Sequence, residues 1–221
     1  MRTIHKILVL VLALAAIPVA AHAIPHVWGV WSWDFDEPVH IVVTPSASGT
    51  PLSSADHPDG SIVDATIRVQ LWVQGDIIGE PNEPMPVANF PAEDIWLEMP
   101  GLNWCQGGPH ADGNTDADGW FTFSQPLGLG GWSDPPAGSP YVYVMVNGSV
   151  LTEENGPAIT PAIMANSPDI NGDLEVNLQD VSIFTIDYFA GYLFRSDFFW
   201  DGVLNLSDVA WLAASVGDEC P

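Results

Sequence analysis

A twelve-residue acidic segment that occurs twice near the C-terminus restricts the fold of this chain more than any other feature. The copies span residues 169–180 and 197–208, and both carry Asp at positions 1, 5 and 12, Asn at position 9 and Leu at position 10. Carboxylates at this spacing repel one another when the chain is compact, unless a cation neutralises them. This part of the sequence therefore predicts metal-dependent folding.

The segments offer oxygen atoms at the spacing of an EF-hand loop, which binds calcium through positions 1, 3, 5, 7, 9 and 12, with position 7 contributing its backbone carbonyl. The corresponding residues are Asp169, Asn171, Asp173, Glu175, Asn177 and Asp180 in the first loop, and Asp197, Asp201, Val203, Asn205 and Asp208 in the second. One such segment alone would be typical of an ordinary Asx turn. Two tandem copies favour two Ca²⁺ sites, with Mg²⁺ as the weaker candidate because it usually retains several waters.

The two loops differ at two positions. Phe199 replaces an oxygen ligand in the second loop, which predicts a weaker site there. Leu174 takes the sixth position of the first loop, where Gly202 in the second loop supplies the sharp turn that this position requires. A missing ligand should cost more than turn strain of about 1 to 3 kcal/mol.

Each loop precedes an apolar segment with helical spacing, residues 181–193 and 209–216. In the second segment Val209, Leu212, Ala213 and Val216 are expected to share one buried face. The aromatic stretch at residues 189–196 is expected to belong to the core, with a binding face as the alternative.

At these residues the sequence resembles the bacterial dockerin family, whose members carry two D-x-N-x-D-x-x-x-N-x-x-D loops, each leading into a helix. The match covers about residues 167–217, and Phe199 departs from the family pattern. The resemblance implies a small all-α calcium-binding module at residues 166–221 that folds with calcium and binds a cohesin module. By position, the partner-binding residues would be Leu178, Gln179, Leu206 and Ser207.

Residues 24–165 are rich in Gly, Pro, Trp, Val and Thr, and short alternating runs are separated by turn residues. Ile67, Val69, Leu71 and Val73 alternate with polar or outward-facing neighbours, as in a half-buried strand. Further strands are expected at residues 40–43, 95–99, 120–124, 141–146 and 149–152. This pattern predicts an antiparallel all-β immunoglobulin-like sandwich. Residues 64–73 and 115–123 resemble bacterial immunoglobulin-like or carboxypeptidase-regulatory-like sandwiches.

Residues 1–23 have a basic head, an apolar run and an Ala-His-Ala end, which is typical of a secretory signal peptide. The mature chain is therefore expected to be secreted, extracellular or at the cell surface, without membrane insertion. It would carry 28 acidic residues against only Arg68 and Arg195, which excludes nucleic acid as a partner. In an oxidising compartment Cys105 and Cys220 could form a disulfide, remain free, or link to another chain.

The sequence offers little for catalysis. Acid pairs such as Asp34 with Asp36, or Asp94 with Glu98, could form a glycosidase dyad, but acids occur throughout the chain. The sequence therefore favours a secreted non-catalytic calcium-binding protein that attaches a β-sandwich to a cohesin-type partner. The alternatives are a small polysaccharide-active protein, either a hydrolase or a carbohydrate-binding module, and a purely structural role for calcium. Trp28, Trp31, Trp33 and Trp72 could stack on sugars or belong to the core.

Overall fold

The computed structural model describes residues 27–32, 38–46, 51–74, 83–105, 108–133 and 142–221. The predicted signal peptide, Trp33, Asp34 and Asp36 lie outside these ranges. Residues 27–166 contain all the described strands and are called the β region below. Residues 167–221 contain both described α-helices and are called the loop–helix region.

The described chain is mostly β-sheet with two short α-helices, which is consistent with the predicted sandwich. The strands are β1 (Val27–Ser32), β2 (Val39–Val42), β3 (Ala55–Asp56), β4 (Ile62–Val63), β5 (Ile67–Gln74), β6 (Pro84–Pro86), β7 (Ile95–Glu98), β8 (Leu102–Trp104), β9 (Trp120–Phe123), β10 (Leu129–Gly131), β11 (Tyr143–Val146), β12 (Ser149–Val150) and β13 (Ile163–Asn166). β5 pairs with β1, β6 and β9. The other strands form the sheets β10-β8, β12-β11-β7 and β13-β2-β3-β4.

Strand β5 confirms the predicted alternation. Ile67, Val69 and Leu71 are fully buried, whereas Arg68 between them is exposed. Because successive side chains of a strand point to opposite faces, one face of β5 enters the core of the β region. Trp72 is half-buried, and its indole nitrogen is buried without a hydrogen-bond partner among the described residues. Its ring is therefore not the fully exposed surface that stacking on a sugar would require.

One strand pair contradicts the prediction of a purely antiparallel fold. β13 runs parallel to β2, with Ile163 opposite Val39 and Asn166 opposite Val42. Tight turns enforce antiparallel pairing only between strands that are close in sequence. β2 and β13 are separated by almost the whole β region, so no such turn fixes their direction.

Both α-helices begin earlier than predicted. α1 spans Leu178–Ala190 and α2 spans Leu206–Ser215, so each starts inside its acidic loop. Asn177 and Asn205 are the N-caps, and each forms a reciprocal capping box with the Asp three residues later. The prediction was wrong because it followed apolar periodicity alone and ignored the Asn-x-x-Asp capping signal.

The buried face of α2 also differs from the prediction. Leu212 is buried as expected, but Val209 and Val216 are exposed, and Asp208 and Ser215 are buried instead. The small core of this region contains Ile170, Val176, Phe184, Phe198 and Leu212. Among the described helices, none is both long and apolar enough to cross a lipid bilayer.

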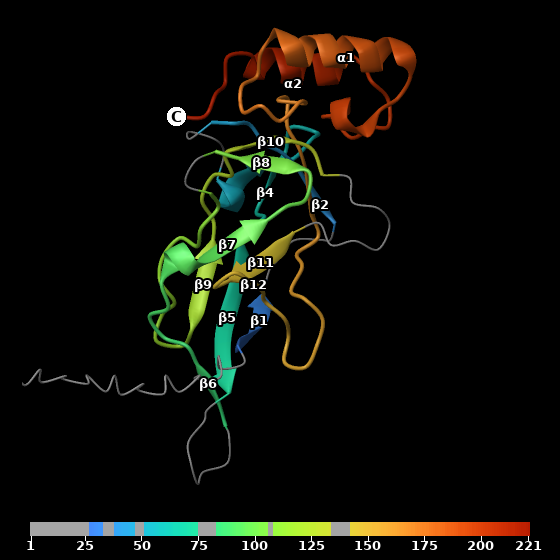
Figure 1. Cartoon of the computed structure of the whole chain (residues 1–221). Coiled ribbons are helices and arrows are strands. Elements are labelled where there is room, and N and C mark those ends of the chain that lie inside the picture. Colours follow the sequence, from blue (N-terminus) through green and yellow to red (C-terminus); the bar gives the residue numbers. More distant parts are fainter. Residues whose placement is uncertain (1–26, 33–37, 47–50, 75–82, 106–107, 134–141) are drawn as a thin grey trace, which may run out of the picture.

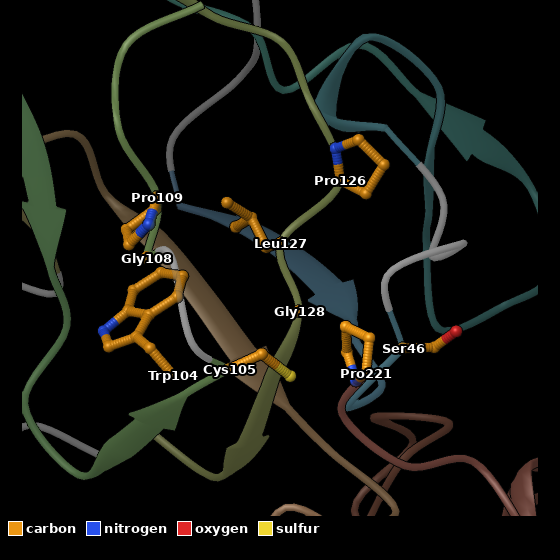
Figure 2. A pocket seen from close by; sticks show the side chains of 9 residues that line it. All are labelled: Ser46, Trp104, Cys105, Gly108, Pro109, Pro126, Leu127, Gly128 and Pro221. Carbon is orange, nitrogen blue, oxygen red and sulfur yellow. The ribbon is translucent and has the colours of Figure 1, made fainter. Parts of the chain in front are cut away.

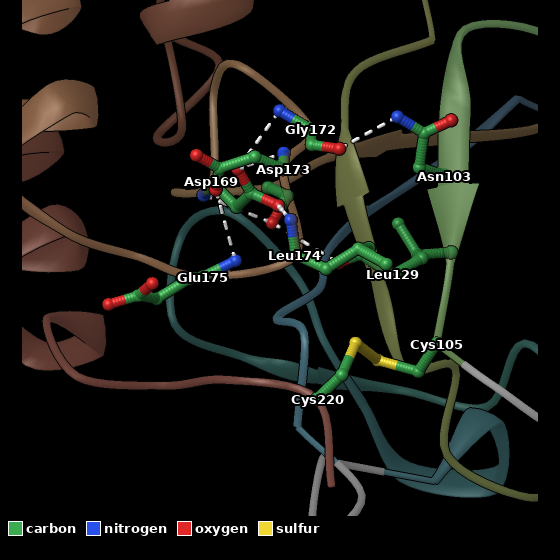
Figure 3. The surroundings of a disulfide bond; sticks show 10 residues. Asn103, Cys105, Leu129, Asp169, Gly172, Asp173, Leu174, Glu175 and Cys220 are labelled. Carbon is green, nitrogen blue, oxygen red and sulfur yellow. Dashed lines mark hydrogen bonds between the residues drawn. A yellow bond between two sulfur atoms is a disulfide. The ribbon is translucent and has the colours of Figure 1, made fainter.

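The loop–helix region packs against one end of the β region, next to β8 and β10 (Figure 1). Trp200 stacks on His40 of β2 with ring centroids 3.7 Å apart, and the Trp211 indole donates to the carbonyl of Pro58 at 3.2 Å. A disulfide between Cys105 and Cys220 adds a covalent link between the two regions (Figure 3). Of the three possibilities left open by the sequence, the structure has the intramolecular bond.

Candidate metal centre

The first acidic loop, residues 169–180, brings three carboxylates to one place. Asp169, Asp173 and Asp180 each offer an oxygen atom, and these atoms all lie within 4.8 Å of one another. Asp169 and Asp180 are fully buried, and Asp173 is exposed. The predicted ligands at positions 1, 5 and 12 therefore converge.

Asp169 is the most tightly held of the three. Its Oδ1 accepts the N–H groups of Gly172 and Asp173 at 2.9 and 3.2 Å, and its Oδ2 accepts that of Leu174 at 2.7 Å (Figure 3). The pKa of Asp169 is raised to about 6, chiefly by burial and also by the carboxylates of Asp180 and Asp173, although the N–H groups of Leu174 and Gly172 lower it. A cation between the carboxylates would offset this cost of burying negative charge.

Asp180 has two roles in the geometry. Its Oδ2 accepts the N–H of Asn177 at 2.9 Å and completes the capping box of α1, while its Oδ1 accepts the N–H of Asn171 at 3.2 Å. The side-chain oxygen of Asn177 is engaged by the N–H of Gln179 at 2.7 Å. The same residues that could bind metal thus fix where the helix begins.

The remaining predicted ligands of the first loop border the cluster. Asn171 accepts the N–H of Asp173 through Oδ1 at 2.8 Å and donates from Nδ2 to Asp173 Oδ2 at 3.0 Å. Glu175 is exposed, and its N–H donates to Asp173 Oδ1 at 3.2 Å. Asn171 therefore lies directly beside a carboxylate of the cluster, as a third-position ligand would.

The second loop, residues 197–208, repeats the hydrogen bonds of the first at equivalent positions. The residue at position 12 accepts N–H groups from positions 3 and 9 in both loops, and the residue at position 1 accepts that of position 6. Positions 4 and 6 have positive φ in both loops: 71° and 72° at Gly172 and Leu174, and 56° and 80° at Trp200 and Gly202. The two loops therefore share these backbone features although seven of their twelve residues differ.

The carboxylates of the second loop are less closely gathered. Among the described residues, only the first loop places three such groups within 4.8 Å of one another. Asp201 is exposed and its Oδ2 accepts Nδ2 of Asn205 at 2.8 Å, while Asp197 Oδ2 accepts the hydroxyl of Tyr192 at 2.9 Å. Burial raises the pKa of Asp208. Val203, the predicted carbonyl ligand, is exposed.

Two buried atoms of the second loop lack a hydrogen-bond partner among the described residues, Oδ1 of Asp197 and the indole nitrogen of Trp200. Asp197 is 1% exposed, and its Oδ1 has no hydrogen-bond partner among the described residues. A buried carboxylate oxygen normally has a hydrogen-bond donor, an ordered water or a cation beside it. The residues of both loops therefore fit a cation, and the first loop offers more side-chain oxygen atoms than the second because Phe199 takes the third position there.

The predicted partner-binding residues lie at the starts of the helices. Leu178 and Leu206, at equivalent positions of the two repeats, are 77% and 80% exposed. Gln179 is exposed, and Ser207 lies half-buried beside Trp211. The interpretation of residues 189–196 as core is wrong for most of the segment: Phe189, Tyr192 and Leu193 are 82%, 50% and 44% exposed, and only Ser196 is buried.

The sequence reasoning missed the residues of the β region that contact the first loop. Asn103 Nδ2 donates to the carbonyl of Gly172 at 2.7 Å (Figure 3). The N–H of Gly131 donates to the carbonyl of Asp169 at 2.7 Å. The signal that could have found them is the Gly-Leu-Gly-Gly run at residues 128–131, because clustered glycines in a strand often mark a close approach of another backbone.

No family model matches the chain, and neither the curated proteins nor the solved structures contain a significant match to it. The assignment of a function therefore depends on the geometry and chemistry of the two loops and of the surface around them.

Proposed function

We propose that residues 166–221 are a calcium-binding dockerin-like module that attaches a secreted, non-catalytic, immunoglobulin-like β-sandwich to a cohesin-type partner. The observation that carries the proposal is the convergence of Asp169, Asp173 and Asp180 in a loop whose hydrogen bonds recur in the second loop. Calcium would bind at both loops, more weakly at the second. Cation binding would neutralise buried negative charge and fix the starts of both helices.

The donor chemistry supports calcium over other metals. The converging groups are carboxylates, with the amide of Asn171 beside them. Hard oxygen donors of this kind suit Ca²⁺, which accepts six to eight of them in flexible geometry. Mg²⁺ demands a nearly ideal octahedron and retains water, so it is the weaker candidate.

Exposed apolar side chains on the helices support a protein partner. Leu178 and Leu206 occupy equivalent positions in the two repeats and are almost fully exposed, and Ile186 and Phe189 of α1 are 63% and 82% exposed. Soluble proteins seldom expose several large apolar side chains on one small region unless that surface binds something. A cohesin-type module that binds the helix starts would cover Leu178 and Leu206.

Calorimetry with the whole mature chain tests the metal. Calcium should bind at a tighter and a weaker site, raise the melting temperature, and lose both effects in chelator. Asp173→Asn should weaken the tighter site at least tenfold. Asp116→Asn is the matched control, because Asp116 accepts two backbone N–H groups in a similar turn of the β region. Absence of calcium binding by the unaltered protein would refute the proposal.

Size-exclusion chromatography with cohesin modules from the same genome tests the partner. Complex formation should require calcium and be lost in the Leu178→Asp, Leu206→Asp double variant. Ile62→Asp is the matched control, because Ile62 is 63% exposed on β4, in the β region. Calcium binding without any cohesin complex would instead support a purely structural role for the metal.

A second candidate function, binding of a neutral polysaccharide chain, is supported by an open groove of about 420 Å³ in the β region. Trp96 and Trp104 line it together with Glu93, Glu98 and His110. A smaller hollow of about 130 Å³ shares Trp104, Gly108 and Pro109 with this groove, and Figure 2 shows the residues that line the hollow. Indole faces can pack on the C–H faces of sugar rings while carboxylates accept their hydroxyl groups.

Retardation of the protein in gels that contain neutral polysaccharides tests this groove. Trp96→Ala should abolish retardation, whereas Trp31→Ala, which removes a 42% exposed indole of β1, should not. Equal retardation of both variants and the unaltered protein would exclude the groove as the binding site. Release of reducing sugar would contradict the non-catalytic assignment.

A further inference from the structure

The first acidic loop is enclosed by the β region as well as by its own residues. The N–H of Gly131 donates to the carbonyl of Asp169 at 2.7 Å, and the N–H of Ser167 donates back to the carbonyl of Gly131 at 2.9 Å. On the neighbouring strand, Asn103 Nδ2 donates to the carbonyl of Gly172 at 2.7 Å. Strands β8 and β10 therefore form hydrogen bonds to the chain both before and after Asp169, the buried first carboxylate of the loop (Figure 3).

Gly130 of β10 makes the closest approach to that carboxylate. A Cβ atom at Gly130 would overlap Oδ2 of Asp169 and lie 2.7 Å from its Cγ. The backbone of Gly130 is not in the left-handed region, so the conformation itself would accept alanine. The space that glycine leaves free at this position is therefore filled by the side chain of Asp169.

The geometry of Asp169 leaves it little room to adjust. Its carboxylate accepts three N–H groups of the loop and lies beside the oxygen atoms of Asp173 and Asp180. A side chain at residue 130 would push the carboxylate away from this point. Because metal ligands must be held within a few tenths of an ångström of their productive positions, such a displacement removes a ligand.

We infer that the first cation site is shared between the two regions: β10 and β8 position Asp169 and the loop, and Gly130 is a positioning residue for the metal. The inference rests on the proposed calcium function and deepens it. The affinity of the first site then depends on an intact β region, and cation binding stabilises the contact between the regions. The β region also contacts the second loop, since Asn166 Nδ2 of β13 donates to the carbonyl of Asp197 at 3.3 Å, but among the described glycines none has a Cβ that would meet the carboxylate of Asp197.

Calcium titration of the whole mature chain by calorimetry tests the inference, with Gly130→Ala compared to Gly113→Ala. Gly113 has open space around it and no left-handed backbone, so alanine should be tolerated there. Gly130→Ala should weaken the tighter site at least tenfold and leave the weaker site unchanged, while Gly113→Ala should match the unaltered protein. The melting temperature in chelator shows whether each variant is folded.

Asn103→Ala provides a second variant in case Gly130→Ala does not fold. It removes one hydrogen bond to the loop from an exposed residue and should weaken the tighter site about threefold to tenfold. Folded Gly130→Ala or Asn103→Ala protein with unaltered calcium affinity would overturn the shared site while leaving the proposed function intact. An unaltered protein that binds no calcium would overturn both.

Discussion

Two residues in the acidic loops have a backbone conformation that their side chains disfavour. Leu174 has φ of 72° and Trp200 has φ of 56°, whereas the equivalent positions of the other loop are Gly202 and Gly172. A residue with a Cβ in this region costs about 1 to 2 kcal/mol relative to the right-handed conformation. Each loop therefore has one strained position, and the equivalent position of the other loop is a glycine, which adopts this conformation without strain.

Leu174→Gly should stabilise the protein by about 0.5 to 1 kcal/mol, because the relief of strain exceeds the added entropy of the unfolded chain. Gly202→Ala is the reverse control. It should destabilise by about 1 kcal/mol, since nothing within 4 Å of its Cβ adds a contact or a clash. Urea unfolding in excess calcium measures both variants. A loss of stability in Leu174→Gly would show that contacts of the leucine side chain outweigh the strain.

Asp169 should make calcium binding depend on pH. Without metal, its pKa of about 6 lies above the unfolded value of about 3.9. Between these values the folded chain binds a proton that the unfolded chain does not, so this contribution to stability is present at pH 4 and is lost as the pH rises through 6. The contribution is on the order of 2 to 3 kcal/mol.

Urea unfolding in chelator should therefore show lower stability at pH 7 than at pH 5. Calcium binding at the tighter site should release about one proton at pH 5.5 and almost none at pH 7.5. Calorimetry in buffers of different ionisation enthalpy counts these protons. Calcium binding at pH 5.5 without proton release would contradict the raised pKa of Asp169.

At the scale of elements, α1 is linked to the short 3₁₀ turn at Phe194–Ser196 by an ion pair between the fully buried Asp187 and the half-buried Arg195. Arg195 donates from Nε and a terminal nitrogen to the two oxygens of Asp187, each at 2.8 Å, and the Ser196 hydroxyl donates to the same carboxylate at 2.7 Å. Burial alone would raise the pKa of Asp187, but these donors outweigh it and lower the pKa. Asp187 is fully buried, so its charge depends on Arg195.

Arg195→Met should destabilise the protein by about 2 to 3 kcal/mol, because it leaves a buried carboxylate without its cation. Arg68→Met is the matched control. The Arg68 guanidinium lies over the Trp120 ring at 4.3 Å on an exposed strand face, and its loss should cost less than about 1 kcal/mol. Chemical denaturation at pH 7 measures both, and equal losses would contradict the structural role of the ion pair.

The elements differ in how far their sequences predict them. β5 is predictable because its alternation is local and one face is buried. The sequence signals that start α1 and α2 are also local, because they are the Asn-x-x-Asp capping boxes. The Asp of each box is also the last ligand position of its loop, so the metal-binding pattern masks the capping pattern. The parallel pairing of β13 with β2 is set by tertiary packing and leaves no local trace.

At the scale of the whole molecule, the candidate site depends on residues far apart in sequence. The convergence of Asp169, Asp173 and Asp180 follows from loop spacing and was predictable. The contributions of Asn103 and Gly130 were not, because they come from strands whose position relative to the loop is set only by the packing of the two regions. The same packing decides which of the possible cysteine pairings forms.

The Cys105–Cys220 disulfide links the end of β8 to the C-terminal tail, and both β8 and the tail contact the first loop. Cys105 follows β8, and Cys220 lies in the C-terminal tail, which pairs with the loop through the N–H of Val176 to the carbonyl of Asp218 at 2.8 Å and the N–H of Cys220 to that of Leu174 at 3.2 Å. The bond therefore fixes the tail, and through the tail the loop, to the strand that carries Asn103.

Replacing both cysteines by serine should destabilise the protein by about 3 to 5 kcal/mol, because the bond closes a loop with a sequence separation of 115 residues. It should also weaken the tighter calcium site severalfold, since the tail, which pairs with the loop, is then no longer linked covalently to the end of β8. Each single Cys→Ser variant, with its remaining thiol blocked, should match the double variant, because either change breaks the same bond. Calcium affinity unchanged in a folded double variant would mean that the strands alone position the loop.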